Sequence, residues 1–100
     1  MELKNYIWNI YEIAKENNVA RDVARDMFIT NMELGTDKYK GATNVSYRRI
    51  GLKWKALTAS QKHHEKEEFN RITKEHLKPL SEAWQAKDKK AFDAVIAGIQ

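Results

Sequence analysis

Apolar residues recur along this 100-residue chain at intervals of three and four, the spacing that places side chains on one face of an α-helix. Residues 3–16 and residues 19–34 each contain such a stripe, so each segment is predicted to be helical. Asn17-Asn18 separates them, and Gly35 stands where a glycine commonly ends a helix. The stripe positions are Leu3, Ile7, Ile10 and Ala14 in the first segment and Val19, Ala20, Val23, Ala24, Met27 and Phe28 in the second.

A third helix is predicted from about Asn44, a favourable N-cap residue, to Leu57, after a glycine-flanked loop at 35–43. One side of this helix forms an apolar seam suited to a core. Basic residues occupy the other side together with Val45 and Leu52, so either a neighbouring helix covers these two residues or they belong to a binding surface. The seam residues are Tyr47, Ile50, Trp54 and Leu57.

A helix start is predicted at Thr58, because Thr58 and Gln61 have the spacing of a capping box. The fourth helix should run from Ala59 to about Lys78 and stop or kink before Pro79. Asp88 is placed to cap a last helix, whose apolar positions are Phe92, Val95, Ile96 and Ile99.

The composition favours an all-α domain, because one proline and four glycines provide few of the turns that a sandwich or barrel needs. The absence of cysteine excludes disulfides and cysteine-based zinc sites. No apolar run approaches the roughly 18 residues of a membrane span, so no membrane partner is expected.

Positive charge is concentrated in the middle of the chain, although the net charge is only +4. Residues 35–62 hold seven cations and one acid, whereas residues 1–34 hold four cations and six acids. A localised basic block suits a polyanion such as DNA, and a solvated surface is the alternative interpretation. The seven candidate DNA-binding cations are Lys38, Lys40, Arg48, Arg49, Lys53, Lys55 and Lys62.

Motifs for catalysis are absent from the sequence, which has no phosphate-binding glycine loop, nucleophile elbow or HExxH pattern. His64 and Glu68 lie one helical turn apart and could share a metal ion. The adjacent His63 points about 100° away from that pair, so a solvated polar face is the preferred interpretation. We therefore expect no enzyme activity, no cofactor and no metal site.

The segment IGLKWKALTASQK at residues 50–62 resembles the centre of the HMG box, in which a helix ends in a pattern similar to LGxxWKxLS and a turn opens the next helix. The similarity extends more weakly to RDMFITN at 25–31 and covers about residues 24–78. The matching positions are Ile50, Gly51, Trp54, Lys55, Leu57, Thr58 and Lys62.

This resemblance implies an HMG-box-like, L-shaped three-helix core in residues 19–78, with an added N-terminal helix in 1–18 and a helical extension in 79–100. It also implies binding to double-stranded DNA in a widened, bent minor groove, with little base specificity. Trp54 would be buried between the helices, and Arg48, Lys53 and Lys55 would contact phosphates. The implied wedge or base-edge contacts are Asn44, Val45 and Ser46 at the second helix, and Phe28 or Ile29 at the first.

Two functions therefore remain open at this stage. One is an architectural DNA-binding protein of chromatin or transcription regulation, in the nucleus or in a mitochondrial nucleoid. The other is a helical protein–protein interaction module without DNA binding, which the mild net charge favours. The terminal helices either pack on the central domain or form a surface for a partner or a second copy, and their typical anchor residues are Trp8, Tyr11, Trp84 and Phe92.

Overall fold

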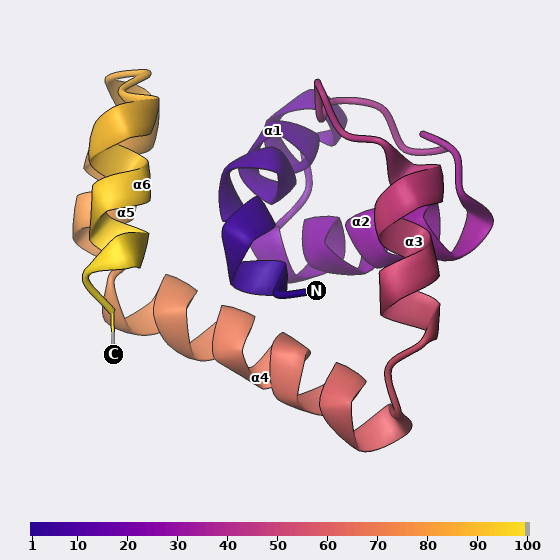
Figure 1. The fold of residues 1–100 in the computed structure, drawn as a ribbon. Helices are drawn as coiled ribbons and strands as arrows, with labels where there is room; N and C mark the ends of the chain where they lie inside the picture. The colour runs from indigo at the N-terminus through magenta and orange to yellow at the C-terminus, as the bar shows by residue number, and fades with distance from the viewer. Residues whose placement is uncertain (100) are drawn as a thin grey trace.

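The computed structural model describes residues 1–99, and within that range the chain is all-α, as the sequence predicts (Figure 1). A short 3-10 helix, η1 (Leu3–Tyr6), precedes the α-helices. These are α1 (Ile7–Asn17), α2 (Arg21–Leu34), α3 (Tyr47–Lys55), α4 (Ala59–Glu75), α5 (Leu77–Gln85) and α6 (Lys89–Ala97).

The first two α-helices end where the sequence predicts. Asn18 follows α1 in the left-handed conformation, with φ of 52°. Gly35 follows α2 with φ of 73°, and its N–H donates to the Asn31 carbonyl at 2.8 Å. A left-handed residue at this position terminates a helix and redirects the chain, which is why the α2 stripe stops at Leu34.

The third α-helix begins at Tyr47, three residues later than the predicted start at Asn44. Asn44 has φ of 58°, which cannot continue a right-handed helix, so the loop extends to Ser46. The buried Asn31 secures this loop, because its side chain both donates to the Tyr39 carbonyl and accepts the Tyr39 N–H, each at 2.9 Å. The contact between Asn31 and Tyr39, eight residues apart, holds the loop, and the left-handed Asn44 moves the start of α3 to Tyr47.

The predicted seam is confirmed for Tyr47, Ile50 and Trp54, which are buried against the rest of the core. The predicted fourth member, Leu57, lies beyond the end of α3 at Lys55 and is half-buried. Gly51 lies on the same side and permits a close approach of α2. A Cβ atom built at Gly51 would lie 2.1 Å from the Met32 carbonyl oxygen, well inside van der Waals contact. This close packing with α2 fixes which side of α3 faces solvent.

The fourth helix starts with the predicted capping box, in which the Gln61 N–H donates to Thr58 Oγ1 at 3.1 Å and the Thr58 N–H donates to Gln61 Oε1 at 2.8 Å. The predicted end at about Lys78 is wrong: α4 stops at Glu75, and α5 starts at Leu77. Pro79 therefore lies in the first turn of α5, where its missing N–H is not needed for a helical hydrogen bond.

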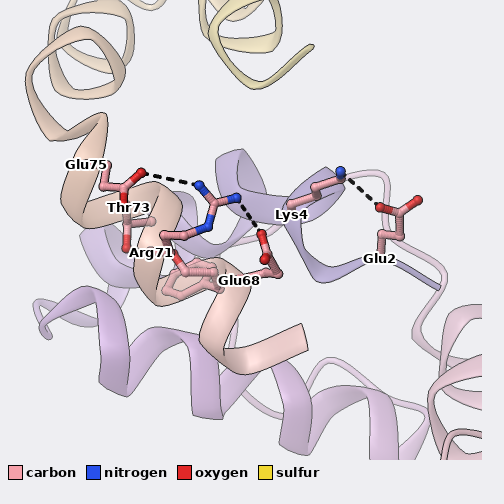
Figure 2. Close-up of polar contacts among 7 residues, drawn as sticks. Glu2, Lys4, Glu68, Arg71, Thr73 and Glu75 are labelled. Atoms are coloured by element: carbon pink, nitrogen blue, oxygen red, sulfur yellow. Dashed lines mark hydrogen bonds and ion pairs between the residues drawn. The ribbon is translucent and has the colours of Figure 1, made fainter. Parts of the chain in front are cut away.

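The N-terminal segment packs on α4 and lies inside the angle that α3 and α4 make (Figure 1). Leu3 is fully buried, and its N–H donates to Glu65 Oε1 at 2.8 Å. Figure 2 shows the surrounding polar contacts, in which Arg71 joins Glu68 at 2.6 Å and Glu75 at 3.2 Å along α4.

The terminal helices pack on each other through their aromatic residues, and η1 and α1 also contact α4 and α2 of the central region. Trp8 of α1 meets Trp84 of α5 and Phe92 of α6 edge to face, at ring-centroid distances of 4.6 and 5.1 Å. Asp88 caps α6 as predicted, accepting the Ala91 N–H at 3.0 Å. One core cluster extends from Leu3 to Phe92, so segments 1–18, 19–78 and 79–100 share it.

Candidate nucleic-acid interface

The solvent side of α3 carries four exposed cations: Arg48, Arg49, Lys53 and Lys55. No acidic side chain within residues 1–99 lies at ion-pair distance from any of them; the ion pairs of this part of the chain involve other cations. Together with Leu52, these four residues are called the α3 basic face below. Their charge is not neutralised by the fold, so it is available to an anionic partner.

Leu52 lies in the middle of this face, within one helical turn of Arg48, Arg49 and Lys55. Its side chain is 66% exposed, the largest exposure among the big apolar residues of the described chain. The alternative that a neighbouring helix covers Leu52 is therefore wrong. Val45 differs, because it precedes α3 and packs half-buried against the core.

The two ends of α3 relate differently to its cations. Lys53 and Lys55 stand in the last turn, where positive charge is favourable beside the negative end of the helix dipole. Arg48 and Arg49 stand in the first turn, where the same dipole makes positive charge unfavourable. The helix dipole therefore favours the positions of the two lysines and disfavours those of the two arginines.

The start of α3 also provides an open pocket of about 500 Å³, lined by Asn44, Val45, Ser46 and Arg48 among others. Ser46 occupies the N-cap position without a side-chain capping bond, so the first N–H groups of α3 lack that partner. Unpaired N–H groups at a helix start beside an arginine suit a phosphate oxygen. The structure therefore brings together the three residues that the sequence identifies as wedge or base-edge candidates, in a pocket that one cation, Arg48, and one acid, Asp37, also line.

The remaining three candidate cations each lie near an acidic or aromatic side chain of the protein. Lys40 is paired with Asp37 at 3.3 Å, and the Lys38 ammonium lies 5.4 Å from the Tyr39 ring centroid, both in the exposed loop. Lys62, in the first turn of α4, lies 6.0 Å from the Trp54 ring centroid at the other end of α3. These three lysines flank the α3 basic face rather than belonging to it.

The predicted wedge at Phe28 or Ile29 is wrong for this structure, because both side chains are buried. The Phe28 ring packs between Tyr6 and Tyr47, at centroid distances of 5.5 and 5.4 Å. Neither residue can reach a ligand without opening the core. The exposed apolar residue next to the cations is Leu52, and its signal in the sequence is its position between Arg48, Arg49 and Lys55.

The structure pairs Glu68, one of the two residues considered as metal ligands on α4, with an arginine. Within residues 1–99, no three metal-ligating side chains gather closely enough to hold an ion. Glu68 accepts a hydrogen bond from Arg71, and this bond lowers the pKa of the Glu68 carboxyl (Figure 2).

Over residues 1–99, no helix has both the length and the apolar character that crossing a lipid bilayer requires.

Comparison with known protein families, curated proteins and solved structures finds no match to this chain. The HMG-box resemblance therefore stays a hypothesis drawn from residues 24–78. Function has to be inferred from the surface of the molecule, in which the α3 basic face is the largest group of unpaired cations on one helix among residues 1–99.

Proposed function

We propose that the chain is an architectural DNA-binding protein that holds duplex DNA against the α3 basic face. The observation that carries this proposal is the presence of four exposed, unpaired cations on a single nine-residue helix. Clustered lysines and arginines displace counterions from phosphates, which gives affinity without base specificity.

In this proposal α2, α3 and α4 correspond to the three helices of the HMG box. The N-terminal segment fills the angle between α3 and α4, so the DNA is placed on the outer side of α3 rather than inside that angle. The α3 cations contact phosphates, and a phosphate oxygen sits at the start of α3 near Ser46. Leu52 provides the apolar contact that favours a widened, bent minor groove. Such a protein would act on chromosomal DNA in the nucleus or in a mitochondrial nucleoid.

The test is the binding of a labelled duplex of about 20 base pairs, measured by fluorescence anisotropy over a series of salt concentrations. We expect affinity to fall steeply with salt for the wild-type chain. The double variant Arg48→Glu/Lys53→Glu should bind much more weakly, with a log–log salt slope reduced by roughly two.

The matched control is Lys78→Glu/Lys90→Glu, which makes the same change in net charge at exposed positions on α5 and α6. It should keep most of the wild-type affinity. Equal losses in the two double variants would mean that only the overall charge matters, and absence of binding at low salt would exclude the proposed function.

A second candidate function is a protein–protein interaction module, which the exposure of Leu52 favours. The two functions differ in their response to Leu52→Gln, which removes the apolar contact and keeps every charge. A DNA-binding surface dominated by phosphate contacts should retain its salt slope in this variant. A protein-binding surface centred on Leu52 should instead lose its partner, as apolar anchors commonly dominate such contacts.

A further inference from the structure

A second cationic site lies away from α3, in an open pocket of about 560 Å³. The pocket is formed by the C-terminal part of α1, the start of α2 and the junction of α4 with α5. No residue of the α3 basic face lines it. The side chains relevant to its chemistry are Tyr11, Lys15, Arg21, Lys74, Leu77 and Trp84.

Arg21 is the fixed charge of this pocket. Its guanidinium lies over the Tyr11 ring, 4.7 Å from the centroid, and its Nη2 donates to Ser81 Oγ at 3.1 Å. Arg21 is half-buried, yet no carboxylate of residues 1–99 is paired with it. A positioned guanidinium without an internal counter-ion is suited to an external anion.

Two more cations, Lys15 and Lys74, line the same pocket, and neither forms an ion pair in the described part of the chain. The one acid in the lining is Asp22, so three cations face a single carboxylate. Lys87 lies outside the pocket lining but close to Lys15: desolvation lowers its pKa and Lys15 lowers it further, while Glu12 acts in the opposite direction. The positive charge here exceeds what the protein neutralises.

Two polar features of the pocket also lack partners. Ala20 occupies the N-cap position of α2 and offers no side-chain acceptor; the Asp22 carboxylate accepts the Val23 N–H at 2.9 Å, so the N–H groups of Arg21 and Asp22 are the ones without a side-chain partner. The Tyr11 side chain lines the pocket while its hydroxyl is buried without a hydrogen-bond partner, which normally carries a cost. The helix start and the cations come from different parts of the sequence and line one pocket.

We propose that this pocket binds a phosphomonoester dianion that carries an apolar or aromatic group. A dianion matches an excess of two positive charges better than a carboxylate does. The apolar portion would rest on Val19, Trp84 and Leu77, which is 44% exposed. The phosphate belongs either to a small molecule or to the end of a nucleic acid strand, and both sources offer the same chemistry.

The experiment titrates the protein with phenyl phosphate at about pH 7.5, where the phosphate is a dianion, and follows backbone amide shifts by NMR. Saturable shifts at Arg21, Asp22 and Val23 are expected, with a dissociation constant of about 1 mM or lower. Benzoate should bind more weakly. Absence of saturable shifts at these amides would overturn the proposal.

Variants make the site assignment specific. Lys15→Gln/Lys74→Gln changes two exposed positions and should weaken phenyl phosphate at least about fivefold without altering the fold. Tyr11→Phe should also weaken it, while Lys78→Gln/Lys90→Gln is the matched control and should bind as wild type. Equal affinity in Lys15→Gln/Lys74→Gln and wild type would show that the pocket is not the site.

The two phosphate sources and the proposed DNA function are separated by further comparisons. Arg48→Glu/Lys53→Glu should bind phenyl phosphate normally, so loss of one function does not imply loss of the other. If a 5′-phosphorylated short strand competes with phenyl phosphate and the unphosphorylated strand does not, the site binds the terminal phosphate of a nucleic acid strand. If neither strand competes while phenyl phosphate binds, the site takes a small molecule, and both outcomes support a phosphomonoester site.

Discussion

At the scale of single residues, Gly51 has the strictest steric requirement of the described chain. A Cβ atom there would lie 2.1 Å from the Met32 carbonyl oxygen, which is backbone and cannot rotate away. Alanine is the better helix former by about 1 kcal/mol, but overpacking costs about 1–3 kcal/mol, and this clash is severe. The steric term therefore outweighs the helical propensity.

We therefore predict that Gly51→Ala destabilises the protein by about 1–3 kcal/mol, measured by urea unfolding. Gly98→Ala is the matched control, because a Cβ at that position meets only ordinary contacts beyond 3.4 Å. The control should be neutral or slightly stabilising. Equal stability of the two variants would mean that α2 and α3 are not in close contact at Gly51.

A second prediction at the scale of single residues concerns how the stability of the fold depends on pH. The hydrogen bond from Arg71 lowers the pKa of Glu68 below its usual 4.5, so the ionised form is favoured in the folded state. A carboxyl with a lowered pKa contributes stability that is present above pH 4.5 and is lost as the pH falls through the folded value.

Replacing Arg71 by Gln should therefore reduce stability near neutral pH and flatten its dependence on pH below about 4.5. The effect should be small, because the pair is solvated. Urea midpoints measured from pH 3 to 7 give the comparison. A profile for Arg71→Gln parallel to the wild-type profile would show that this ion pair does not contribute.

At the scale of elements, the start of α4 depends on local hydrogen bonds. The capping box at Thr58 and Gln61 satisfies two N–H groups that the helix itself cannot. This end of α4 follows α3 after a short turn, so the cap also determines the direction in which α4 leaves α3 (Figure 1).

Thr58→Ala should cost about 1 kcal/mol of unfolding free energy, because the side-chain oxygen that accepts the Gln61 N–H is lost. Ser60→Ala is the control, since Ser60 is exposed and makes no side-chain hydrogen bond in the described structure. Thermal unfolding followed by circular dichroism measures both. A Thr58→Ala midpoint equal to that of Ser60→Ala would contradict the capping role.

At the scale of the whole molecule, the aromatic residues of the terminal helices close a single core. Phe92 is fully buried and meets both Trp8 and Tyr11, at 5.1 and 5.3 Å between ring centroids. Because Trp54 belongs to the same core cluster, the ends and the middle of the chain should unfold together.

Phe92→Ala is thus expected to cost about 3–5 kcal/mol and to lower the urea midpoint seen by every tryptophan alike. Lys90→Ala, at an exposed position on the same helix, should leave the midpoint unchanged. If a variant lost only the Trp8 and Trp84 signal while the Trp54 signal kept its midpoint, the terminal helices would form a separate unit.

The features that the sequence predicts well are those that depend on neighbouring residues, such as the capping box at Thr58, the Asp88 cap and the stop at Gly35. The errors concern two helix boundaries, the start of α3 and the end of α4, and the burial of single side chains. Asn31 holds the loop and delays α3, which no pattern near Asn44 indicates. The exposure of Leu52 depends on which side of α3 faces α2. The second pocket combines α1 with α5, so the linear sequence gives no signal for it.

The hydrogen bond between Leu3 and Glu65 has a consequence for the order of events during synthesis. Leu3 leaves the ribosome long before Glu65, and Trp8 leaves it long before Phe92. Both apolar residues therefore emerge before the residues that they contact in the folded protein. Closing such distant contacts costs chain entropy that local helix formation does not repay at once. In the nascent chain Leu3 therefore lacks its partner until α4 has been made and Trp8 lacks Phe92 until α6 has been made, and a chain interrupted before Phe92 would leave Trp8 without that contact.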